Sequence, residues 1–82
     1  MAPSTTLPLH EGIVQDTIRC PITLSIMRDP VVAADGFTYE RSAIECWLQT
    51  SNTSPMTNMC LAHKLLSPNI SIKIMCQAAR SS

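Results

Sequence analysis

The pattern of hydrophobic and polar positions changes several times along the chain, and each change marks a different expected element. Residues 18–30 are rich in aliphatic side chains but show no helical or strand period. Pro21 fixes its own backbone and biases Cys20 away from helix, which predicts an ordered loop. A short loop cannot easily bury both of its faces, so some of its apolar residues should face the core and others should form an exposed patch. The residues in question are Ile22, Leu24, Ile26 and Met27.

A β-hairpin is expected next, over residues 31–39. Two β-prone runs, Val31 to Ala34 and Phe37 to Tyr39, flank the dipeptide Asp35-Gly36. This arrangement favours a primed two-residue turn in which Gly36 supplies a positive φ. The carboxylate of Asp35 is expected to accept hydrogen bonds from nearby backbone amides.

A central helix is expected over residues 40–50, because Ile44, Trp47 and Leu48 follow helical spacing. Glu40 would then lie in the first turn, where a carboxylate suits the helix dipole. Leu48 is the better core candidate. Trp47 is therefore expected at the edge of the core, where an indole often serves as an interface anchor.

A second loop and a closing helix complete the pattern. Residues 51–58 are rich in turn formers and carry an exposed Pro55-Met56 pair. Three leucines are expected to return to the core: Leu61, Leu65 and Leu66. Asn69 is a good N-cap for a last helix, with Ile70, Ile74 and Ala78 on one face and Ile72, Met75, Cys76 and Ala79 beside it. Such an apolar helix needs burial on more than one side, so a homodimer is an open alternative.

Length and composition limit the classes of protein that need to be considered. The 82 residues allow one small domain, expected at 13–80, after a flexible linker or chain terminus at 1–12. Six acidic and six basic residues give no formal net charge, so no nucleic-acid partner is expected. No apolar run is long enough to span a bilayer, so no membrane partner is expected either.

The four cysteines are candidates for metal ligands and for catalytic nucleophiles. They are widely spaced, which favours a reduced chain in the cytoplasm, the nucleus or both. Structural zinc needs four ligands, and the only short pair is Cys60 with His63. A nucleophilic cysteine needs a base and an electropositive setting, and Cys20 beside Arg19 offers only a weak hint. We therefore expect no metal, no cofactor and no catalytic residue, and Cys46 and Cys76 are expected to pack within helices.

Several motifs in order resemble the U-box family. They are Cys20-Pro-Ile-Thr, Met27-Arg-Asp-Pro-Val, Asp35-Gly-Phe-Thr-Tyr-Glu-Arg, Ile44 to Leu48, Ser54-Pro-Met-Thr-Asn and Ser67-Pro-Asn. The resemblance covers about residues 17–79. It implies a small α+β, RING-like fold without zinc, with two ordered loops, a β-hairpin, a central helix and a C-terminal helix.

The absence of metal is implied by the residues that stand at the positions of RING ligands. The first site would fall on Cys20, Thr23, Glu40 and Ala43, and the second on Asp35, Phe37, Ser54 and Thr57. Neither set can build a zinc site, so hydrogen bonds and ion pairs must hold the loops instead. We expect Asp35 to accept from Ser54 or from amides of the second loop, and Arg41 to pair with an acidic residue such as Asp29.

The resemblance also implies a function. A U-box recruits a ubiquitin-conjugating enzyme charged with ubiquitin and promotes transfer to a substrate lysine without a covalent intermediate of its own. By this analogy the docking residues are Ile22, Leu24, Trp47 and Pro55, with Met56 and Asn58 alongside. Many relatives carry a basic residue where this chain has Asn58, which brings no charge. Recruitment is thus a safer expectation than strong activation, and a scaffold domain with little ligase activity is the alternative.

Overall fold

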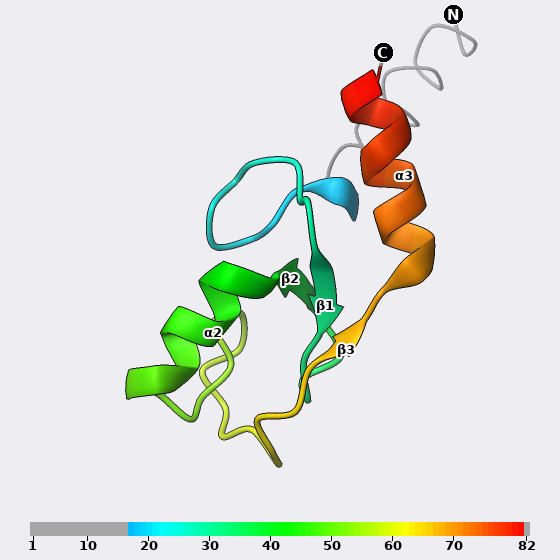
Figure 1. The fold of residues 1–82 in the computed structure, drawn as a ribbon. Coiled ribbons are helices and arrows are strands. Elements are labelled where there is room, and N and C mark those ends of the chain that lie inside the picture. Colours follow the sequence, from blue (N-terminus) through cyan, green and yellow to red (C-terminus); the bar gives the residue numbers. More distant parts are fainter. Residues whose placement is uncertain (1–16, 82) are drawn as a thin grey trace, which may run out of the picture.

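The computed structural model describes residues 17–81 and contains a short sheet and two helices (Figure 1). The strands are β1 (Pro30–Val32), β2 (Thr38–Glu40) and β3 (Ser67–Pro68), and the helices are α2 (Arg41–Thr50) and α3 (Ile70–Ser81). The α+β class expected from the sequence is confirmed. The expected linker, residues 1–12, lies outside the described residues.

The three strands form an antiparallel sheet in the order β2-β1-β3. Val31 pairs with Tyr39 on one side and with Pro68 on the other, so β1 is the central strand. The expected hairpin joins β1 and β2. The third strand was not expected, because two residues carry too little pattern to be recognised before their partner strand is known.

The turn of the hairpin differs from the primed two-residue turn that Asp35-Gly36 suggested. The amide of Gly36 donates to the carbonyl of Ala33 at 3.0 Å, and the amide of Ala33 donates to the carbonyl of Phe37 at 3.0 Å. Gly36 does have a positive φ of 83°. The connection therefore runs over residues 33–37, and the glycine is needed at its exit rather than at its centre.

The central helix α2 begins one residue later than expected. Glu40 ends β2 and is the N-cap residue of α2, but its side chain makes no cap hydrogen bond. The expectation that Glu40 lies in the first helical turn was wrong, because its carboxylate is used elsewhere. Ile44 and Leu48 are buried, as their spacing indicated.

The last helix, α3, packs one face on the core and leaves the other face open. The side-chain oxygen of Asn69 accepts from the amide of Ile72 at 3.1 Å, so Asn69 caps the helix as expected. Cys76 is buried, with Ile72, Met75 and Ala79 packed around it. Ile70 and Ile74 are exposed. Figure 1 shows α3 at the end of the sheet remote from α2.

The buried core contains one aromatic residue, Tyr39, among aliphatic and sulfur-containing side chains, as the low aromatic content indicated. Its buried members are Ile18, Cys20, Met27, Val31, Ala33, Tyr39, Ile44, Leu48 and Cys76. Two expectations about burial were wrong: Leu65 is 74% exposed and Cys46 is exposed. Leucine and cysteine are both apolar residue types, but neither of these two side chains faces the core. No helix of the described part is long and apolar enough to cross a membrane.

Candidate functional site

The first loop, residues 19–26, is a closed and hydrogen-bonded structure. Arg19 and Ile26 form an isolated antiparallel bridge at its base. The amide of Cys20 donates to the carbonyl of Ser25 at 3.0 Å, and the amide of Leu24 donates to the carbonyl of Cys20 at 2.7 Å. The loop is therefore rigid enough to hold its side chains in fixed positions.

The second loop, residues 53–60, repeats this pattern of backbone bonds. Thr53 and Cys60 form the bridge at its base. The amide of Ser54 donates to the carbonyl of Met59 at 2.8 Å, and the amide of Asn58 donates to the carbonyl of Ser54 at 2.9 Å. The segments Cys20-Pro-Ile-Thr-Leu and Ser54-Pro-Met-Thr-Asn thus occupy equivalent places in two similarly built loops.

A polar side chain at the start of each loop accepts two backbone N–H groups. The sulfur of Cys20 accepts from the amide of Ile22 in the first loop at 3.4 Å and from that of Glu40 in β2 at 3.2 Å. The hydroxyl of Ser54 accepts from the amides of Met56 and Thr57 in the second loop at 3.1 and 3.0 Å. Cys20 and Ser54 are both buried, so these bonds also satisfy the polar atoms of the two side chains.

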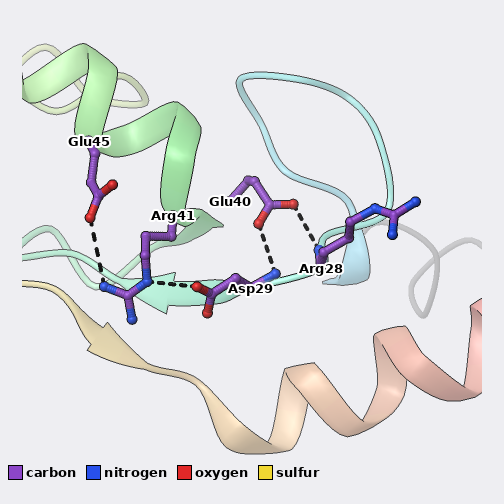
Figure 2. A network of polar contacts seen from close by, with 5 residues as sticks. All are labelled: Arg28, Asp29, Glu40, Arg41 and Glu45. Atoms are coloured by element: carbon purple, nitrogen blue, oxygen red, sulfur yellow. Dashed lines mark hydrogen bonds and ion pairs between the residues drawn. The ribbon is translucent and has the colours of Figure 1, made fainter.

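Glu40 closes the far end of the first loop through its carboxylate (Figure 2). Its two oxygens accept from the amides of Arg28 and Asp29, each at 2.8 Å. The amide of the same residue binds the sulfur of Cys20. Glu40 therefore connects both ends of the first loop to the start of α2, and charge-assisted bonds of this kind are among the stronger ones.

The expected pairing of Arg41 with Asp29 is present. Arg41 Nε lies 2.7 Å from Asp29 Oδ2, and the amide of Arg41 donates to the carbonyl of Asp29 at 2.9 Å. A more distant carboxylate, that of Glu45, lies 3.9 Å from the same guanidinium (Figure 2). The first turn of α2 is thus attached to the segment that leads into β1.

The second loop is attached to the hairpin through Asp35. One oxygen of the Asp35 carboxylate, Oδ2, accepts from the hydroxyls of Ser54 and Tyr39, each at 2.7 Å. The other oxygen accepts from the amide of Phe37 at 2.9 Å. The contact with Ser54 is the one that the sequence suggested. Asp35 also binds its own hairpin, so one side chain joins the turn, the core tyrosine and the second loop.

These contacts set the charge state of the Asp35 site. Partial burial raises the pKa of Asp35, but the hydrogen bonds from Tyr39, Ser54 and Phe37 outweigh it and hold the pKa below its ordinary value. The pKa of Tyr39 is raised, mainly by burial and next by its hydrogen bond to Asp35. Near neutral pH the carboxylate is therefore charged and the phenol is neutral, which is the arrangement that makes Tyr39 the donor.

The residues expected to dock a partner are displayed outside this network. Ile22 is 37% exposed, Leu24 is 72% exposed and Met56 is 48% exposed. Pro55 is half-buried and Asn58 is exposed. Trp47 is half-buried against the core, and its indole N–H donates to the carbonyl of Thr53 at 2.7 Å. That bond joins α2 to the base of the second loop.

Four of the eight positions at which the resemblance would put RING metal ligands carry side chains of this hydrogen-bonded network: Cys20, Glu40, Asp35 and Ser54. Within residues 17–81, no group of three or more His, Cys, Asp or Glu side chains could hold a metal ion. In the short pair once considered for zinc, Nδ1 of His63 accepts from the amide of Leu65 at 3.1 Å, and Cys60 is exposed and free. Cys20 and Cys76 are free and buried.

Sequence reasoning missed several members of the network. The sequence indicated Tyr39 only as a strand residue, and it placed Cys20 at a former ligand position without a role for its sulfur as an acceptor. The sole sequence hint to Tyr39 is its place four residues after Asp35, across the hairpin turn. Lys64 was also missed: its ammonium donates to the carbonyl of Leu48 at 2.8 Å and so satisfies a carbonyl near the end of α2.

Taken together, two similarly built loops, a central helix and polar braces at the metal positions define the class of zinc-free, RING-like domains. Comparison with known families agrees, since the model of the U-box domain matches residues 14–79. The chain belongs to the U-box family. Domains of this family are typically modules of ubiquitin ligases.

Curated relatives carry the same domain within much longer chains. The chain is 54% identical over 69 residues to "WD repeat, SAM and U-box domain-containing protein 1" of Danio rerio. This match covers 83% of this chain and 14% of the relative. It is 56% identical over 55 residues to "U-box domain-containing protein 37" of Arabidopsis thaliana, covering 66% of this chain and 14% of the relative. The human WD repeat, SAM and U-box protein is 46% identical over 67 residues, covering 80% of this chain and 14% of the relative. The chain thus spans about one seventh of the length of these relatives.

Proposed function

We propose that this chain recruits a ubiquitin-conjugating enzyme charged with ubiquitin and promotes transfer of ubiquitin from its thioester to a substrate lysine. The docking surface in this proposal consists of Ile22, Leu24, Trp47, Pro55 and Met56. The observation that carries the proposal is Leu24, a leucine that is 72% exposed and has a φ of 63°.

The conformation of Leu24 is unfavourable for a residue with no role. A left-handed backbone costs a residue with a side chain about 1–2 kcal/mol, and an exposed leucine gains little burial in return. Two bonds hold it: its amide donates to Cys20, and Arg19 Nη1 donates to its carbonyl at 3.2 Å. Strain of this kind concentrates at functional sites, so we assign Leu24 to partner binding.

In this proposal the chain contributes position rather than reactive groups. Holding the charged enzyme near the substrate and restricting the motion of ubiquitin raises the effective concentration of the reacting groups. No side chain of this domain forms a covalent intermediate in the proposed mechanism. The docking surface offers few anchors, so we expect a weak and transient contact.

Asn58 supports a second candidate, a U-box-shaped scaffold with little ligase activity. Asn58 is exposed and directly follows the turn of the second loop. Its amide can form hydrogen bonds, but it offers no charge to a bound enzyme or to ubiquitin. A domain of this kind would bind the conjugating enzyme without strongly stimulating transfer.

The two candidates are separated by a discharge assay. A conjugating enzyme loaded with ubiquitin is mixed with free lysine, and loss of the thioester is followed with and without the domain. The first candidate predicts faster discharge with the wild type and none of that gain with Ile22→Ala or Leu24→Ala. No stimulation by any enzyme of a broad panel would overturn it. Detectable binding without stimulation would support the scaffold.

Suitable controls keep this assay independent of folding. Trp47→Ala also removes the bond to Thr53, so its melting transition must be measured alongside. Leu65→Ala serves as the matched control, because Leu65 is 74% exposed but belongs to neither the docking surface nor α3. It should discharge the enzyme at the wild-type rate.

Two further features of the proposed function concern its setting. Four free cysteines support a location in a reducing compartment, the cytoplasm or the nucleus.

The exposed Ile70 and Ile74 on α3 support homodimerisation as an additional property. Sedimentation at several concentrations tests it, and a purely monomeric profile would reject it.

A further inference from the structure

A groove along one flank of α2 has no role in the proposed function. It is a shallow, open hollow of about 360 Å³ between α2 and residues 64–66. Three leucines line it: Leu48 is buried, Leu66 is half-buried and Leu65 is 74% exposed. The other lining residues are Arg41, Glu45, Gln49 and Lys64, so the hollow combines an exposed leucine with charged side chains, as binding surfaces often do.

The groove faces away from the docking surface. Successive residues of an α-helix are about 100° apart around its axis, so Arg41 and Glu45 lie about 120–160° from Trp47. Both side chains line the groove, and Figure 2 shows them on the same side of α2. A ligand in the groove and a partner on Trp47 can therefore be bound at the same time.

The charges around the groove are unevenly compensated. Arg41 pairs with Asp29 at 2.7 Å and lies 3.9 Å from Glu45. Lys64 forms no salt bridge with any described residue, and its one hydrogen bond there goes to the carbonyl of Leu48. An ammonium has three N–H donors, so Lys64 retains donors for a ligand. The end of the groove near Lys64 is thus positive, beside a leucine-lined surface.

We infer that this groove binds a short acidic segment of another protein, one that places an aliphatic side chain on Leu65 and Leu66 and a carboxylate on Lys64. A second copy of the chain fits less well. The exposed isoleucines and leucines of such a copy lie in the first loop, at Leu65 and on α3. Residues 19–26, residues 63–67 and α3 contain no acidic residue. The charge of Lys64 therefore favours a partner in which leucine and carboxylate are neighbours.

The inference is tested by titrating the full 82-residue chain with peptides while amide NMR shifts are recorded. The probe is the N-acetylated amide of Asp-Leu-Leu-Asp, and the matched probes are Asn-Leu-Leu-Asn and Lys-Leu-Leu-Lys. We expect saturable shifts at the amides of residues 48–49 and 64–66 with the acidic peptide. The neutral peptide should bind about fivefold more weakly, since an exposed ion pair contributes up to about that factor.

Three variants make the test specific. Lys64→Gln should weaken binding of the acidic peptide to the level of the neutral peptide, and Lys64→Arg should restore that binding. Leu65→Ser should weaken binding of all three leucine peptides about threefold or more, because apolar contact is lost. Leu24→Ser is the control on the opposite surface and should leave every titration unchanged.

The outcomes that would overturn the inference are distinct from failure of the proposed function. Equal binding of the three peptides, or no saturation up to about 10 mM, excludes an acidic ligand in this groove. Concentration-dependent shifts of the same amides in the free protein would assign the groove to a second copy instead. Neither result depends on whether the domain discharges a conjugating enzyme.

Discussion

Leu24 and Asn58 occupy the same point of two similarly built loops, and both have a left-handed backbone, with φ of 63° and 65°. Each donates its amide to the carbonyl of the residue that starts its loop, Cys20 or Ser54. Asparagine tolerates this conformation well, whereas leucine does not. The first loop therefore stores strain that the second loop does not, and it does so at its most exposed apolar residue.

Leu24→Gly is expected to stabilise the fold while weakening its function. Glycine removes the strain but loses more entropy on folding, so we expect a net gain of about 0.5–1 kcal/mol in the free energy of unfolding. Urea denaturation measures this gain, and the discharge assay should show less stimulation. Asn58→Gly is the matched control and should change stability little. A destabilised Leu24→Gly would mean that the side chain stabilises the fold.

Asp35→Ala is expected to lower the free energy of unfolding by about 1–3 kcal/mol. The substitution leaves the hydroxyls of Tyr39 and Ser54 without their acceptor, and both residues are buried. Thermal and urea unfolding measure the loss. Unchanged melting would show that Asp35 does not hold the second loop.

The Asp35 carboxylate should also make stability depend on pH. Its pKa in the folded protein is lowered, so it stabilises the fold fully above the unfolded value of about 3.9. That contribution is lost as the pH falls from there through the folded pKa. Asp35→Asn keeps an acceptor oxygen but does not titrate. The stability advantage of the wild type over this variant should therefore shrink below about pH 4, as urea unfolding at several pH values would show. A difference that stays constant with pH would contradict the assignment.

Glu40→Ala is expected to loosen the first loop more than the second. It removes the acceptor of the Arg28 and Asp29 amides, at a cost of about 1–3 kcal/mol. Hydrogen exchange should accelerate at those two amides, while the amides of residues 56–57 keep their protection. Glu45→Ala is the control, because Glu45 has only the 3.9 Å contact with Arg41. This substitution should change the free energy of unfolding by less than about 0.5 kcal/mol.

Addition of a chelator is expected to leave the melting transition unchanged. The first loop is held by Glu40 and the sulfur of Cys20, and the second by Asp35 and Ser54. Bonds of this kind need no metal, so EDTA should not alter the midpoint in a calorimetric or circular dichroism scan. A lowered midpoint that zinc restores would reveal a structural metal.

Features that depend on neighbours in sequence could be predicted from the sequence. The hairpin followed from Asp35-Gly36 between β-prone runs, although its turn proved longer than expected. The capping of α3 by Asn69 followed from one residue type before a periodic run. Both are local preferences of the backbone, which a sequence states directly.

Burial at the ends of elements could be predicted less well. Leu65 and Cys46 were expected inside and are exposed, while Cys20 is fully buried as an acceptor of two amides. The type of a residue indicates only a preference for burial. Whether a residue meets the core depends on where the chain passes relative to α2 and the sheet.

The sequence alone determined the order of the hairpin, the central helix and the last helix, the family, and the residue types that replace metal ligands, because local periodicity and motif spacing are properties of the sequence itself. Only the tertiary structure decided the remaining connections, those of Glu40 to Arg28 and Asp29 and that of Asp35 to Tyr39. It also created the groove beside Lys64. The physical reason is that a hydrogen bond requires both partners within about 3 Å in the right direction. Such proximity between distant residues arises only when the chain has packed.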